Sequence, residues 1–110
     1  ALAAFGADLD RRDLAGSVLV ATTSEFGRRA KDNGSGTDHG TASCALLMGP
    51  VHAGSHGEPV SLTQLDADDN LVATASFEAY YATLAATWFG IDAERVLPSR
   101  PRPIDGILTT

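Results

Sequence analysis

The sequence has little cysteine and no long apolar run, and each shortage excludes a class of protein. A single cysteine, Cys44, cannot form a disulfide within the chain, which excludes a disulfide-stapled mini-protein. No apolar run approaches the roughly 18 residues of a membrane-spanning helix, so no membrane span is predicted. No signal peptide is evident near the start of this chain. Cys44 lies within an apolar run and is predicted to be a small buried packing residue.

Positive charge is also scarce. The chain has 8 Lys and Arg against 14 Asp and Glu, for a formal net charge of −6. This balance lacks the basic surface that binds phosphate backbones, so nucleic acid is not an expected partner. Hydrophobic residues at 44% and charged residues at 20% are close to the average of folded proteins, which excludes a disordered tail and a collagen-like repeat. The 110 residues are expected to form a single domain or part of a larger one.

The apolar pattern predicts an α/β organisation. Apolar residues recur at spacings of three and four between residues 1 and about 12, which is the period of one helical face. Two apolar runs, residues 18–23 and 42–48, show no polar alternation, as is typical of strands buried on both faces of a parallel sheet. A helix followed by a buried strand is half of an α/β repeat, so we expect mostly parallel buried strands with flanking helices.

The clearest helix signal covers residues 76–90. Ser76 is a suitable N-cap, Glu78 lies near the positive end of the helix dipole, and Gly90 supplies a stop. Large side chains follow one face at spacings of four, three and four: Phe77, Tyr81, Leu84 and Trp88. Such a stripe is more typical of a core-facing surface than of a binding surface. Residues 98–110 begin with three prolines in six positions and are predicted to form an extended tail.

The segment between the two apolar runs is predicted to be a long loop that carries the functional site. Residues 24–40 are rich in glycine and hydrogen-bonding side chains and poor in residues that could form a core. Because the segment follows a predicted buried strand, it occupies the position where open α/β sheets bind ligands. Gly36 and Gly40 bracket one turn, and each could allow a close backbone approach or a positive φ.

Three side chains of this loop could act together on a divalent cation: Glu25, Asp38 and His39. Carboxylate oxygens and an imidazole nitrogen suit zinc or manganese, and three protein ligands leave a coordination position for substrate. Arg28 could hold an anionic group by a bidentate fork. Plainer interpretations stay open, because Asp38 could form a helix cap or a local turn, and Glu25 could form an ion pair with Arg28.

Two other clusters of polar residues are assigned no function. His52 and His56 form a pair four positions apart without accompanying cysteines, which favours exposed loop residues. Asp66, Asp68 and Asp69 lack the glycine and the terminal glutamate of a calcium-binding loop, so a solvated face or loop is the expectation.

Two motifs, SEFGR at residues 24–28 and GTDHG at residues 36–40, together resemble a large uncharacterised bacterial family related to sulfatases and alkaline phosphatases. The similarity covers about residues 15–95. The resemblance implies a three-layer α/β/α sandwich and metal-assisted hydrolysis of phosphate or sulfate esters. It also implies export by the twin-arginine route, and therefore a periplasmic or extracellular location for the full-length protein.

The same resemblance assigns residues to the metal site. It implies that Glu25 replaces an aspartate ligand, that Asp38 and His39 supply later ligands, and that Phe26 stands at a ligand position where it cannot bind metal. The nucleophile of such relatives lies in an amino-terminal half without a counterpart in this sequence. The chain is therefore expected to be the carboxyl-terminal portion of a larger alkaline-phosphatase-like domain, inactive in isolation.

Two functions follow as hypotheses. In the first, the protein is an exported hydrolase of anionic phosphate or sulfate esters, in which Glu25, Asp38 and His39 bind zinc or manganese and Arg28 stabilises the anionic substrate group. In the second, it is a non-catalytic binding or assembly component of the bacterial envelope with a degenerate metal site. Exposed sheet edges or the aromatic helix could also support a homo-oligomer.

Overall fold

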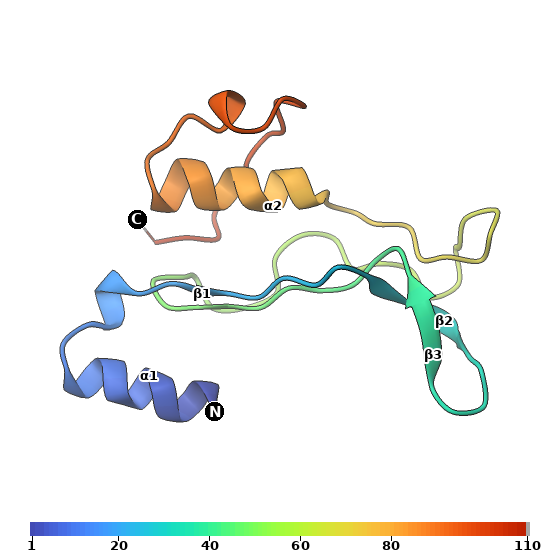
Figure 1. Ribbon diagram of the computed structural model, residues 1–110, viewed down its shortest axis with the longest axis horizontal. Coiled ribbons are helices and arrows are strands. Elements are labelled where there is room, and N and C mark those ends of the chain that lie inside the picture. Colours follow the sequence, from blue (N-terminus) through green and yellow to red (C-terminus); the bar gives the residue numbers. More distant parts are fainter. Residues whose placement is uncertain (110) are drawn as a thin grey trace.

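The computed structural model describes residues 1–109 and contains two helices, four short strands and three short helical turns. In chain order they are α1 (Leu2–Arg11), η1 (Ala15–Ser17), β1 (Val20–Ala21), β2 (Gly27–Asp32), β3 (Thr37–Gly40), β4 (Leu47–Met48), α2 (Phe77–Thr83), η2 (Leu84–Trp88) and η3 (Ala93–Arg95). Figure 1 shows α1 on one side of the β1–β4 pair and α2 on the other, with the β2–β3 hairpin at one end of the molecule. None of the helices among these residues is long and apolar enough to cross a membrane.

Both sheets are two-stranded and antiparallel. In the first, Val20 lies opposite Met48, and the hydroxyl and backbone of Thr22 extend the pairing to Leu46. In the second, Arg28 lies opposite His39, and a bulge separates this pair from the next pairing toward the turn. The second sheet is therefore a bent hairpin.

The expected three-layer α/β/α sandwich with mostly parallel buried strands is wrong. The described chain holds only antiparallel pairs, and apart from Gly27 its strand residues are half-buried or exposed rather than covered on both faces. A parallel pair needs a crossover connection, usually a helix. Here the connection between the two apolar runs folds as the β2–β3 hairpin, so the chain doubles back and β4 pairs antiparallel with β1.

The prediction of one long loop over residues 24–40 is also wrong, because most of this segment forms β2 and β3. The hairpin is largely exposed, so its strands carry no apolar alternation that would identify them in the sequence. The turn between them is closed by side chains: Asp32 Oδ1 accepts from the Gly34 N–H at 2.6 Å, and Asn33 Oδ1 accepts from the Ser35 N–H at 3.0 Å. The apolar runs contribute only two paired residues each, and Cys44, between β3 and β4, is exposed rather than buried.

Both predicted helices are confirmed. α1 occupies the first predicted range, and Ser76 caps α2 by accepting a hydrogen bond from the Ala79 N–H at 3.0 Å. Beyond η2, Gly90 adopts a φ of +64°, the left-handed conformation that ends many helices. The prediction that the stripe of large side chains faces the core holds only in part: Leu84 and Trp88 are half-buried, whereas Phe77 is 54% exposed and Tyr81 is 39% exposed.

α2 instead turns small side chains inward. Ala82 and Thr83 are almost completely buried. Thr83 Oγ1 donates to the Ala79 carbonyl at 2.7 Å and accepts from the Ile104 N–H at 2.8 Å, which attaches the carboxyl-terminal segment to the helix. Within the predicted extended tail, residues 98–109 form no helix, and Leu108 forms an antiparallel bridge with Val51.

The core is small and scattered along the chain. Its buried apolar residues are Leu9, Ala42, Leu71, Ala82, Ala93, Ile107 and Leu108. The accessible surface is 7883 Å², against about 5,800 Å² for a compact protein of 11.4 kDa. The radius of gyration is 16.2 Å, against about 13 Å for a compact domain of this length. The chain is therefore loosely packed, with much of its apolar surface outside the core.

Close packing at the base of the hairpin gives the first prediction. A Cβ added at buried Gly27 would lie 1.9 Å from the Ala42 carbonyl oxygen, whereas one at Gly16 would meet nothing within 4 Å. We expect Gly27→Ala to lower the free energy of unfolding by about 1–3 kcal/mol through overpacking. Gly16→Ala should change it by less than about 0.5 kcal/mol. Urea denaturation of the two variants measures the difference, and equal effects would contradict the described packing.

Candidate functional site

Two adjacent tyrosines of α2 join the helix to the chain that leaves β1. The Tyr80 hydroxyl donates to the Thr22 carbonyl at 2.9 Å. The hydroxyls of Tyr81 and Thr23 are hydrogen-bonded, also at 2.9 Å. Because these partners are 58 positions apart in sequence, the two bonds fix where α2 lies over the segment between β1 and β2.

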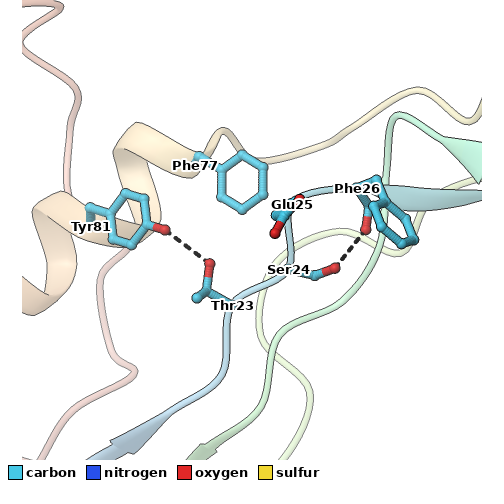
Figure 2. Close-up of a pocket in the computed structure, with 6 residues that line it drawn as sticks. All are labelled: Thr23, Ser24, Glu25, Phe26, Phe77 and Tyr81. Carbon is cyan, nitrogen blue, oxygen red and sulfur yellow. Dashed lines mark hydrogen bonds between the residues drawn. The ribbon is translucent and has the colours of Figure 1, made fainter.

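A pocket lies beside this junction and opens to solvent (Figure 2). Its volume is about 710 Å³, and its lining residues are Thr23, Ser24, Glu25, Phe26, Phe77 and Tyr81. The rings of Phe77 and Tyr81 are stacked on one face of α2, with centroids 6.1 Å apart and planes inclined by 16°. The Ser24 hydroxyl donates to the Phe26 carbonyl at 2.8 Å and so shapes the opposite wall.

The base of the β2–β3 hairpin carries a second arrangement. The His39 ring stacks on the Phe26 ring, with centroids 3.5 Å apart and an interplanar angle of 11°. The guanidinium carbon of Arg28 lies 5.3 Å from the Phe26 centroid, and Nη1 of Arg28 donates to the Thr37 carbonyl at 2.8 Å. Among residues 1–109, Arg28 forms no ion pair, so the alternative of a local ion pair with Glu25 is absent from this part of the chain.

The three predicted metal ligands occupy different surroundings. Asp38 and His39 are consecutive residues of β3, and successive side chains of a strand project from opposite faces. Asp38 Oδ1 accepts from the side-chain amide of Asn33 at 2.8 Å, whereas His39 stacks on Phe26 and Glu25 lines the pocket. No group of three His, Cys, Asp or Glu side chains within the described chain could hold a metal ion. As arranged here, Glu25, Asp38 and His39 therefore do not form a shared ligand set for zinc or manganese.

The predicted backbone behaviour of the two glycines is confirmed, one by a positive φ and the other by a close backbone approach. Gly36 has a φ of +143°, which favours glycine. A Cβ at Gly40 would lie 2.7 Å from the carbonyl carbon of Arg28, so the strands approach more closely there than any larger residue allows. These glycines shape a hairpin rather than a turn that aims two neighbouring side chains at one point.

The remaining polar clusters line neither the pocket nor the Phe26–His39 stack, although Nη2 of Arg29 in β2 donates a hydrogen bond to the Asp68 carbonyl. His52 and His56 are exposed, and Nε2 of His56 lies 2.7 Å from the His52 carbonyl oxygen. Asp66 Oδ1 accepts from the backbone N–H groups of Asp68 and Asn70, both at 2.9 Å. The acidic cluster thus forms an exposed, self-bonded turn, as its composition predicted.

Sequence reasoning missed Phe77 and Tyr81 as pocket residues because their helical spacing matched that of a core stripe. A signal was nevertheless present in the type of residue. A tyrosine hydroxyl needs a polar partner when its ring is packed, so a stripe that contains tyrosine often marks the edge of a core. The Thr23 hydroxyl is such a partner for Tyr81, whereas the neighbouring Tyr80 bonds to the backbone carbonyl of Thr22.

Comparison with known proteins identifies one related family. A family model described as a protein of unknown function, DUF1501, matches residues 1–100. Neither the curated proteins nor the solved structures include a match to the chain. The matched range contains both the pocket and the hairpin base.

The Tyr80 hydrogen bond predicts a pH dependence of stability. Burial, followed by the neighbouring Tyr81 phenol, raises the pKa of Tyr80 above its ordinary value of 10.0. Because the folded state holds this proton more tightly than the unfolded state, the protonated phenol contributes to stability. The contribution is complete below pH 10 and is lost as the pH rises through the folded-state pKa. We therefore expect the free energy of unfolding to fall in this alkaline range.

Tyr80→Phe isolates this effect. The phenol of Tyr80 is followed by ultraviolet titration, as the difference between the wild-type curve and the Tyr80→Phe curve. The midpoint of this difference should lie above pH 10 in the folded protein and near the ordinary tyrosine value in denaturant. The alkaline loss of stability should be smaller in the variant. A folded-state midpoint at or below the denatured one would contradict the partly buried hydrogen bond of Tyr80.

Proposed function

The chain belongs to the DUF1501 family of proteins of unknown function, and we propose that it binds the anionic group of a phosphate or sulfate ester at the base of the β2–β3 hairpin. The observation that carries the proposal is the setting of Arg28. Its guanidinium is held by the Phe26 ring and the Thr37 carbonyl, and within residues 1–109 it has no carboxylate partner. A positioned and unpaired guanidinium suits the bidentate recognition of a tetrahedral anion.

The neighbouring groups support the same ligand. A guanidinium has five N–H donors, and one nitrogen of Arg28 is engaged with Thr37. His39 lies directly across the ladder from Arg28 and can donate a further ring N–H. Because the protein carries a net charge of −6, the attraction is local, and binding should weaken steeply with added salt.

The ligand class is supported by the motifs that surround Arg28. The SEFGR and GTDHG segments resemble a family related to sulfatases and alkaline phosphatases, whose substrates are esters of these anions. In this proposal the protein is an exported binding component of the bacterial envelope, periplasmic or extracellular. Anion binding by Arg28 is also what a hydrolase of such esters would require, so the proposal is common to both hypotheses.

Substitution of Arg28 tests the proposal. Phenyl phosphate and phenyl sulfate should bind the wild type, and Arg28→Gln should weaken binding by about tenfold or more, because charge-assisted hydrogen bonds are lost. Arg28→Lys should restore part of the affinity, since it retains the charge without the fork. The measurement is a calorimetric titration at low ionic strength.

Lys31→Gln is the matched control, because it removes the same charge from the same strand. Its affinity for phenyl phosphate should stay within about twofold of the wild type, as expected for a more distant exposed charge. Equal losses in Arg28→Gln and Lys31→Gln would show that only the overall charge of the hairpin matters and would exclude a site at Arg28.

A metal-dependent hydrolase of these esters is the second candidate. The combination of Glu25, Asp38 and His39 with the SEFGR and GTDHG motifs favours it. In the described chain these three side chains do not converge on one metal position. A zinc or manganese enzyme would therefore need a different set of ligands or a different arrangement of these three. The nucleophile for such a reaction has no assigned residue in the chain.

Metal analysis separates this candidate from a binding protein. If the chain is part of a metal-dependent hydrolase, dialysis against zinc or manganese should leave stoichiometric metal. If Asp38 and His39 are among the ligands, Asp38→Ala and His39→Ala should each lower the metal affinity by about tenfold or more. Asp10→Ala, which removes an exposed carboxylate of α1, is the control. A metal-free protein that cleaves no aryl phosphate or aryl sulfate would exclude hydrolysis by the chain.

A further inference from the structure

The pocket beside α2 has a chemistry unlike that of the hairpin base. Its lining combines the aromatic rings of Phe77 and Tyr81 with the Glu25 carboxylate and the hydroxyl-bearing residues Thr23 and Ser24. Among residues 1–109, no lysine, arginine or histidine lines it. Figure 2 shows Glu25 between Phe77 and Ser24, with Tyr81 held by Thr23 on the other side.

We propose that this pocket binds a small organic ammonium ion, with Phe77 and Tyr81 as the aromatic wall and Glu25 as the counter-charge. The face of an aromatic ring carries negative electrostatic potential, so it attracts alkylated ammonium groups. The carboxylate adds a full negative charge beside the rings. The pocket therefore offers such an ion both a charge partner and a surface for its alkyl groups.

The exposure of the rings supports this assignment. Phe77 is 54% exposed and Tyr81 is 39% exposed, although large aromatic side chains are normally well buried. Stacking at 6.1 Å and the hydrogen bond between Tyr81 and Thr23 hold the two rings in place, so an incoming ligand finds a wall that is already ordered. A volume of about 710 Å³ falls within the usual range of small-molecule sites.

Other ligand classes fit less well. An anion would be repelled by Glu25, and a neutral apolar molecule would have to strip water from the carboxylate without replacing it. A metal ion needs several oxygen or nitrogen ligands. Nowhere among the described residues do three Asp, Glu, His or Cys side chains come close enough together to hold one. Phe26 borders the pocket, but its ring is stacked against His39, so Phe77 and Tyr81 carry the recognition.

The proposal does not rest on anion binding, because Arg28 and His39 do not line the pocket and Phe26 is the one residue that borders both places. Choline and its neutral tert-butyl isostere are suitable probes, since they share shape and differ in charge. In an NMR titration, choline should bind at least about tenfold more tightly than the isostere and should shift the Phe77 and Tyr81 ring signals. Equal affinity for the two compounds, or no binding of choline at millimolar concentrations, would overturn the proposal.

Two variants and a control locate the site. Glu25→Gln, which removes the charge, and Phe77→Leu, which removes the ring and retains bulk, should each weaken choline binding by about tenfold. Glu78→Gln removes the same charge from the residue next to Phe77 but outside the pocket, and should leave binding within about twofold. If Glu25→Gln and Glu78→Gln weaken choline binding equally, the effect comes from the overall charge of the protein, and the proposed site is overturned.

A vesicle assay identifies the source of the ammonium group. If free choline binds and vesicles of phosphatidylcholine do not sediment the protein, the ligand is a free small molecule. If the vesicles sediment the wild type and not Glu25→Gln, the same pocket takes a lipid headgroup. Circular dichroism of each variant confirms that the fold is retained.

Discussion

Two hydrogen bonds from adjacent tyrosines connect α2 to the chain that leaves β1, and the other features of the molecule are arranged around this junction. Tyr80 bonds to the backbone of Thr22, and Tyr81 bonds to the side chain of Thr23. On another side of the same helix, Thr83 holds the backbone of Ile104. α2 thus links the strand segment with the carboxyl-terminal segment, and the pocket exists because the helix is held at this place.

The helices could be predicted from the sequence and the sheets could not, for a physical reason. The signals for α2 are local: the Ser76 hydroxyl meets an N–H three residues away, and Gly90 ends the element by its own conformational freedom. Strand pairing depends on distant partners. An apolar run of six or seven residues looks like a buried strand, yet only two residues of each run pair. At Thr22, the Leu46 N–H is met by the side-chain hydroxyl and only the Thr22 N–H makes a backbone bond across the pair.

At the hairpin base, the sequence singles out residues but does not give their arrangement, and it does not identify Phe77 and Tyr81 as pocket residues. Gly36 and Gly40 act as their positions suggested, and Arg28 lies at an exposed, structured place. The interpretation of Asp38 and His39 depended on a loop, in which neighbouring side chains can converge. In β3 they diverge, because the pleat alternates successive side chains between the two faces. One error in secondary structure therefore changed the predicted chemistry.

The large surface of the folded chain has a consequence for its unfolding thermodynamics. A molecule that already exposes 7883 Å² has less surface left to expose when it unfolds than a compact protein of the same length. The heat-capacity increment and the denaturant dependence of stability both scale with newly exposed surface. Both quantities should be small for 110 residues, which gives the chain broad, shallow unfolding transitions and a flat stability curve across temperature.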